Sequence, residues 1–270
     1  MPVLYDNVIY TKARSRLCKG LVLRMVTNPL VIQFAKTAGF DVVWIEMEHS
    51  NYSLQEASVL ANAAVLSGMT PIVRVPYECG MGYVQQVLDS GALAVVFPHI
   101  SSAKEAIHAV QMCKFPPVGK RSLWLQQAAV GLRTLPPQQL ADEVNATGSA
   151  ACMMIETGEA IQNIEEIAAV EGVEMLMVGC IDLSADMRIP GQIHNPKFRA
   201  ALEAVSIACL RHGKVFGLAG SYSDMEFQDW IINTLGVRIV LGNVDSNMLS
   251  IAAMETTARM GAVDRTGLPN

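Results

Sequence analysis

The sequence predicts an α/β protein, a single (β/α)8 barrel that uses the whole chain. Eight short apolar runs alternate with longer segments of helical periodicity along the 270 residues. Apolar runs of this length, bounded by Gly, Pro or polar residues, are typical of strands buried on both faces, and the helices between them imply parallel connections. The length suits one barrel. No linker divides the sequence, so we expect one domain over residues 1–270.

The eight predicted strands follow one another in order at residues 21–26, 42–47, 71–75, 92–97, 150–155, 173–178, 215–219 and 237–241. The clearest helices between them are expected at residues 53–66, 81–88, 103–112 and 196–210. An open doubly wound sheet is the alternative, and it would usually carry a Gly-rich nucleotide loop after the first strand. Here Thr27-Asn28-Pro29 follows that strand and indicates a helix start, which favours the barrel.

Two further segments stand out. The connection before the fifth strand is long, with residues 114–121 leading into 122–137, and a long excursion in a compact barrel is usually functional or an oligomer contact. Residues 247–260 predict a final helix rich in Met and Ala, which we expect to pack its apolar face against the barrel.

The composition excludes several classes of function. There are 20 basic and 25 acidic residues, a net charge of −5, and no Lys/Arg cluster, so we expect neither nucleic-acid nor membrane binding. No apolar run approaches the roughly 20 residues that span a bilayer. The six cysteines have no metal-type spacing. A reduced, soluble, cytoplasmic protein that acts on a small molecule is the expectation.

Polar residues follow several predicted strands directly, and in an α/β barrel these strand ends form the active-site face. The residues concerned are Glu46, Glu48 and His49 after the second strand, Arg74 after the third, Glu156 after the fifth and Asp182 after the sixth. Two carboxylates, Glu156 and Asp182, suit a hard cation such as Mg²⁺ or Mn²⁺. Arg74 offers a planar fork for a substrate carboxylate, and His49 can transfer protons near neutral pH.

Each of these residues also has a structural explanation. Asp182 could cap the following helix, Arg74 could pair with Glu46 or Glu48, and His49 could be a loop residue without a chemical role. Their coincidence at the same ends of four strands is what favours a site.

In addition, the sequence resembles the HpcH/HpaI aldolase family over nearly its whole length. The motifs that carry the resemblance are Ala38-Gly39-Phe40-Asp41 leading to Glu48-His49, Pro71-Ile72-Val73-Arg74, Leu88-Asp89-Ser90-Gly91-Ala92, Phe115-Pro116-Pro117-Val118-Gly119-Lys120-Arg121, Ile155-Glu156-Thr157 and Val178-Gly179-Cys180-Ile181-Asp182-Leu183-Ser184. The last is highly specific to the metal site of that family.

The resemblance implies a barrel of the phosphoenolpyruvate/pyruvate type and a class II aldolase. It implies Glu156 and Asp182 as ligands of Mg²⁺, Mn²⁺ or Co²⁺, and Arg74 as the residue that contacts the oxo acid. It also implies that His49, paired with Asp89, relays the proton. The substrate would further meet Met154, Leu218 and the backbone N–H groups around Ile181 and Asp182. The assembly implied is a dimer-based homo-oligomer such as a hexamer, with the helix at about 245–260 exchanged between subunits.

The sequence departs from the family pattern in the pocket walls. Glu46-Met47 stands where many members have Asp-Gly, Met154 replaces a usual Gln, and Ser122 replaces a Gly. On the first strand Val22 replaces a common Trp, and Arg24 stands where a small residue is common. Because of these changes, the sequence does not identify the substrate.

The function expected is a divalent-metal-dependent carbon–carbon lyase that cleaves or forms 4-hydroxy-2-oxo acids, with pyruvate or a related oxo acid and an aldehyde as partners. One alternative is oxaloacetate decarboxylation, or a biosynthetic synthase, through the same pyruvate enolate. Another alternative is a barrel that binds a metal or ligand without catalysis.

Overall fold

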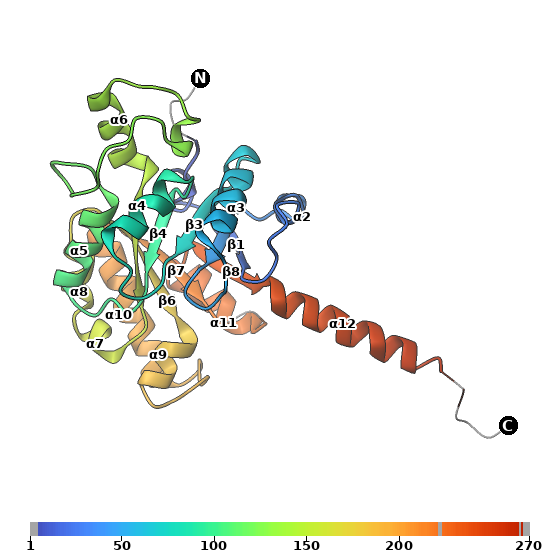
Figure 1. Cartoon of the computed structure of the whole chain (residues 1–270). Helices are drawn as coiled ribbons and strands as arrows, with labels where there is room; N and C mark the ends of the chain where they lie inside the picture. The colour runs from blue at the N-terminus through green and yellow to red at the C-terminus, as the bar shows by residue number, and fades with distance from the viewer. Residues whose placement is uncertain (1–4, 221–222, 265, 267–270) are drawn as a thin grey trace.

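The computed structural model describes residues 5–220, 223–264 and 266. Within them, strands in sequence order close into one parallel barrel surrounded by helices (Figure 1). The strands are β1 (Cys18–Leu23), β2 (Val42–Glu46), β3 (Thr70–Arg74), β4 (Ala94–Phe97), β5 (Ala150–Ile155), β6 (Val173–Gly179), β7 (Val215–Ala219) and β8 (Ile239–Val244). β8 returns to β1 with Ile239 opposite Cys18, so the predicted (β/α)8 barrel is confirmed.

Helices connect successive strands, and one more precedes β1 and another follows β8. They are α1 (Val8–Thr11), α2 (Val31–Thr37), α3 (Leu54–Leu66), α4 (Met81–Asp89), α5 (Ala103–Cys113), α6 (Pro137–Glu143), α7 (Gly158–Gln162), α8 (Ile164–Ala169), α9 (Cys180–Asp186), α10 (Pro196–His212), α11 (Met225–Asp229) and α12 (Asp245–Gly261). Local sequence explains several starts. Ser53 and Glu56 form a capping box at α3, and Asn195 caps α10 with Pro196 in its first turn.

The alternation of side chains along each strand divides the core into two apolar layers. One layer fills the barrel and includes Trp44, Met154 and Met177. The other lies between the strands and the helices and includes Ile155 and Leu218. Successive residues of a strand point to opposite faces, so a residue at a strand end faces the active-site pocket only if it belongs to the inner set.

The first strand ends three residues earlier than the sequence predicted. The backbone N–H groups of Arg24, Met25 and Val26 donate to the carboxylate of Asp245, over 3.1, 2.9 and 2.8 Å. Because these donors are bound by a side chain, they are not available to extend the β-ladder. Asp245 is buried at the start of α12, and it holds the segment after β1 against the rim of the barrel.

The last helix does not pack along its own barrel. α12 projects away from the body of the molecule (Figure 1), and of its residues only Asp245 is buried. The expectation that this helix covers the barrel of its own chain is therefore wrong for the single chain. Among the described residues, no helix combines the length and apolarity needed to cross a membrane.

Candidate active site

A cavity of about 280 Å³ opens at the carboxyl ends of the strands. Its walls combine an apolar inner surface with charged groups at the rim, namely Val22, Arg24, Trp44, Glu46, His49, Arg74, Met154, Gly179, Cys180, Ile181, Asp182, Ala219, Gly220, Leu241 and Val244. Most residues that the sequence placed at strand ends thus meet at one cavity, as the barrel geometry requires. Leu218 is not among them.

Arg74, the last residue of β3, is held between two glutamates. Its Nε lies 2.7 Å from Oε2 of Glu46, and its Nη1 lies 3.0 Å from Oε2 of Glu48. Burial opposes the charge on Arg74, but Glu46, Glu48 and Glu156 raise the pKa of the guanidinium, so Arg74 stays cationic. The structural ion pair considered from the sequence is present, and the same guanidinium also lines the cavity.

Glu46 is fixed from several directions. Its Oε2 accepts from the indole Nε1 of Trp44 over 3.1 Å, and its Oε1 accepts from the backbone N–H groups of Glu48 and His49 over 2.8 and 3.1 Å. Glu46-Met47 stands where an Asp-Gly pair is common in the family that the sequence resembles. The larger Glu side chain therefore shapes the turn after β2. This turn sets the positions of Glu48 and His49 at the cavity edge.

Glu156, directly after β5, shares one carboxylate oxygen with His99. The backbone N–H of His99 donates to Oε1 of Glu156 over 2.7 Å, and Nδ1 of the same imidazole lies 3.1 Å from that oxygen. Burial raises the pKa of Glu156, with a further contribution from the charge of Asp182, against the lowering effects of His99 and Arg74. Oε2 of Glu156 lies beside Gly179, the residue that precedes α9 and therefore Asp182.

The residues present fit a divalent cation. Among the described residues, Oε2 of Glu156 receives no hydrogen bond, and a Cβ built on Gly179 would lie 3.1 Å from this oxygen. Gly179 thus keeps a space free beside Glu156, one turn before Asp182 in α9. In the described part of the chain no three His, Cys, Asp or Glu side chains cluster as a metal site. Two carboxylates with further positions for water and substrate oxygens match Mg²⁺ or Mn²⁺.

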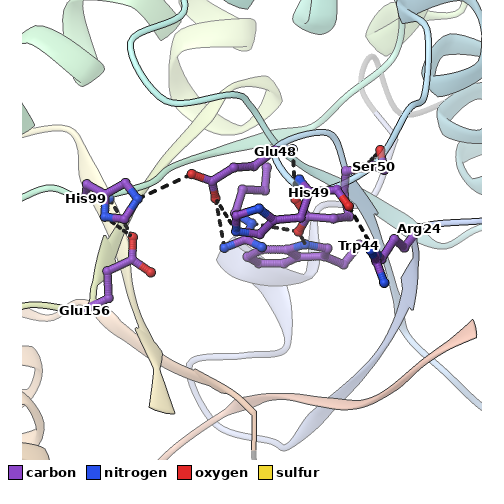
Figure 2. A network of polar contacts seen from close by, with 9 residues as sticks. Arg24, Trp44, Glu48, His49, Ser50, His99 and Glu156 are labelled. Atoms are coloured by element: carbon purple, nitrogen blue, oxygen red, sulfur yellow. Dashed lines mark hydrogen bonds and ion pairs between the residues drawn. The ribbon is translucent and has the colours of Figure 1, made fainter. Parts of the chain in front are cut away.

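His99 is the main residue that the sequence analysis missed. It follows β4 at Pro98-His99, and its Nε2 also lies 3.5 Å from Oε1 of Glu48 (Figure 2). Glu48 in turn contacts Arg74, so a continuous polar network runs from Glu156 through His99 and Glu48 to Arg74. The strand-end rule, applied to the fourth strand as to the others, would have identified His99.

His49 and Asp89 are not brought together in the chain. The imidazole of His49 is largely exposed, with Nε2 3.6 Å from Oε2 of Glu48. Asp89 ends α4, and its Oδ1 lies 2.5 Å from Nη2 of Arg121, a residue of the long connection that is 1% exposed. Arg121, buried beside the ring of Phe115, needs an anionic partner, and Asp89 serves as that partner here.

Some of the residues expected to contact the substrate line the cavity. Met154 and Ile181 line the cavity with Asp182. Leu218 is 1% exposed and belongs to the layer between strands and helices, so its predicted place in the pocket is wrong. Successive side chains of a strand point to opposite faces, and Ala219 and Gly220 form this part of the wall instead.

Comparison with known proteins identifies the family. The model of the family described as HpcH/HpaI aldolase/citrate lyase matches residues 23–229. The chain belongs to this family. It is 51% identical over 99% of its length to the 4-hydroxy-4-methyl-2-oxoglutarate aldolase tasA of Hapsidospora irregularis, all of which is covered. It is equally similar, over 98% of its length and 99% of the relative's, to the 4-hydroxy-4-methyl-2-oxoglutarate aldolase cghB of Chaetomium globosum.

The fold agrees with the solved structure of the HpcH/HpaI aldolase from Desulfitobacterium hafniense. The two share 27% sequence identity with a TM-score of 0.83, over 99% of this chain and 98% of that one. The family comprises divalent-metal-dependent class II aldolases, and this HpcH/HpaI chain is a carbon–carbon lyase of that class. The comparisons favour the aldolase over the decarboxylase and over the barrel without catalysis.

Proposed function

We propose that this HpcH/HpaI aldolase cleaves 4-hydroxy-4-methyl-2-oxoglutarate, or a close analogue with a carboxylate on C4, into two 2-oxo acids. The observation that carries the proposal is full-length similarity, at 51% identity, to two aldolases named for that substrate. The cavity supports it, because Asp182 and the guanidinium of Arg74 line one rim and Glu156 lies beside Gly179 in the same wall, an arrangement that suits the cleavage of an oxo acid. With this substrate the electrophilic product is pyruvate, a ketone, in place of the aldehyde expected from the sequence.

The cofactor proposed is Mg²⁺, Mn²⁺ or Co²⁺ held by Glu156 and Asp182, as the fit of the two carboxylates supports. When bound there, the cation supplies Lewis-acid polarisation of the 2-oxo group. The chain's part is to hold Glu156 in place through His99 and to keep Oε2 free of other hydrogen-bond donors within the described residues.

Retro-aldol cleavage breaks the bond between C3 and C4. The C4 hydroxyl loses its proton and becomes the carbonyl of one pyruvate, and the bonding electron pair stays on C3 to give the enolate of the other. His49, exposed at the cavity edge, is the proposed acceptor of the hydroxyl proton and the source of a proton for C3. Arg74 places positive charge beside the oxygen on which the negative charge develops.

We also propose that the enzyme is a homo-oligomer in which α12 is exchanged between subunits. The projection of this helix from the barrel (Figure 1) and the exposure of its Met, Leu and Ile side chains support the proposal.

The test is pyruvate release from racemic 4-hydroxy-4-methyl-2-oxoglutarate with Mg²⁺, Mn²⁺ or Co²⁺, with oxaloacetate assayed in parallel. We expect two pyruvates per molecule cleaved, loss of activity with a chelator, and a fall in kcat/KM of about 10²-fold or more for Glu156→Gln. The control is Glu165→Gln, an exposed carboxylate of α8 that pairs with Arg211. No release from this substrate, with release from other 4-hydroxy-2-oxo acids, would overturn the substrate proposed.

A further inference from the structure

Arg24 stands at the cavity rim, directly after β1, in a fixed position. Its backbone N–H donates to Oδ1 of the buried Asp245, and the two following amides donate to Oδ2 of the same carboxylate. Asp245 is the first residue of α12, so the segment after β1 that carries Arg24 is tied to the segment that follows β8. The guanidinium therefore projects from a constrained backbone, as specificity residues require.

The side chain of Arg24 is oriented by His49. Nε of Arg24 donates to the backbone carbonyl oxygen of His49 over 2.8 Å (Figure 2). Within the described part of the chain this is the guanidinium's single hydrogen bond, so both Nη groups remain free to donate. A guanidinium with two free Nη groups can bind a carboxylate through charge-assisted hydrogen bonds.

The two guanidinium groups of the cavity differ in their charge balance. Arg74 has carboxylate oxygens of Glu46 and Glu48 within 3.0 Å of its nitrogens. Arg24 has no carboxylate partner among the described side chains, although it lines the same cavity. Arg24 is therefore the cation whose charge is available to an anionic group of a ligand. The wall beside it is apolar and includes Val22, Leu241 and Val244.

We propose that Arg24 binds the carboxylate on C4 of the substrate and so selects a 2-oxo acid, in preference to a neutral aldehyde or ketone, as the second cleavage product. The inference rests on the function proposed above. In that substrate C4 carries both the hydroxyl and the carboxylate, so their partners in the protein must be neighbours. Arg24 Nε donates to the backbone carbonyl of His49 and both residues line the cavity, so the two are neighbours at its rim. The methyl group on C4 can face the apolar wall.

The kinetic test compares two substrates that differ at this one group. 4-Hydroxy-4-methyl-2-oxopentanoate has a methyl where 4-hydroxy-4-methyl-2-oxoglutarate has the C4 carboxylate. Arg24→Gln is expected to lower kcat/KM for the diacid roughly 10- to 100-fold, mainly through KM, and to change that for the monoacid less than about threefold. Arg24→Lys should restore part of the loss. Arg211→Gln, which removes an exposed cation of α10, should change neither.

A binding measurement separates this proposal from the proposed function. In the presence of Mg²⁺, calorimetry compares 2-oxoglutarate with 2-oxopentanoate, which replaces the distal carboxylate by a methyl. The wild type should bind 2-oxoglutarate more tightly, and Arg24→Gln should remove that preference while it keeps the folded state by circular dichroism. A preserved preference, or an equal loss for both ligands, would overturn the role of Arg24. If Arg24 gives the expected preference for 2-oxoglutarate but the enzyme does not cleave the diacid, only the substrate proposed above is overturned.

Discussion

Oε1 of Glu156 receives two contacts from a single residue, His99: the backbone N–H at 2.7 Å and Nδ1 at 3.1 Å. His99 adopts a left-handed backbone conformation with φ of 55°. Non-glycine residues rarely occupy this region, although His is one of the more tolerant types. The conformation turns both groups toward one oxygen, which leaves the other oxygen of Glu156 for a ligand. His99 is thus a positioning residue for the proposed cation site.

We predict that His99→Phe weakens Mn²⁺ binding by roughly tenfold, because groups that orient a metal ligand typically contribute on this scale. Phe keeps an aromatic ring where His99 packs edge-on against Tyr77, with ring centroids 5.0 Å apart, but it removes Nδ1. Isothermal titration of Mn²⁺ measures the change. The matched control is His108→Phe on the exposed face of α5, which should bind as the wild type does. An unchanged dissociation constant for His99→Phe would contradict the positioning role.

Metal affinity should also fall at acidic pH through Glu156. Burial raises the pKa of this carboxyl above its usual value, so its proton competes with the cation at a higher pH than for an exposed Glu. Below that pKa, each further pH unit should weaken binding by about tenfold, since one proton must be released; above it, binding should no longer depend on this group. Mn²⁺ titrations across the acidic range test the prediction. A flat profile there would show that Glu156 is not a ligand.

The polar strand ends were predictable because the topology forces them together. Once parallel strands close into a barrel, Glu46, Arg74 and Asp182 must share one rim, whatever their distance in sequence. The strand at residues 150–155 was predicted with its observed bounds, since its apolar run is unbroken and both faces are buried.

The partners of long side chains were not predictable in the same way. The end of β1 depends on Asp245, which is more than two hundred residues away and binds the amides that follow the strand. The resemblance to the family implies that Asp89 takes part in a proton relay, yet here its carboxylate meets Arg121. Leu218 faces the helices because of the register of β7, which hydrophobicity alone does not reveal.

Gly179 offers a steric test of the cation site. A Cβ at this position would lie 2.9 Å from Cε of Met154 and 3.1 Å from Oε2 of Glu156. The methionine end can move, but Glu156 is held by His99, so Gly179→Ala is expected to displace the ligand oxygen and weaken Mn²⁺ binding by about tenfold. Gly82→Ala is the control, because its Cβ would meet nothing within 4 Å. Binding by Gly179→Ala equal to that of the wild type would argue against a cation at Oε2.

The pairing of Asp89 with Arg121 predicts an effect on stability. Asp89→Asn removes the counter-charge of a guanidinium that is 1% exposed and whose Nε and Nη1 have no hydrogen-bond partner among the described residues. Leaving a buried charge unpaired typically costs about 3 kcal/mol, so the free energy of unfolding should fall by that order. Urea unfolding measures it, with Asp142→Asn on the exposed side of α6 as the control. Full stability with lost activity would instead favour the pairing of Asp89 with His49.

The exposed apolar side chains of α12 predict that the chain assembles. Met248, Leu249, Ile251 and Met254 are between 40% and 61% exposed, on a helix that contacts its own chain mainly at its first turn. A helix with such a surface gains free energy when another subunit buries it, because apolar area then leaves water. Light scattering of the full chain should therefore give a mass of at least twice the 29.2 kDa of one chain.

Deletion of residues 247–270 should lower the mass toward that of a single chain, or cause aggregation through the surface that α12 covers on its partner. Deletion of residues 262–270, which follow α12, serves as the control and should leave the assembly intact. A monomeric full-length chain would contradict the exchange. An oligomer that survives loss of α12 would place the interface on the barrel itself, because the remaining subunit contacts could then come only from its outer helices and loops.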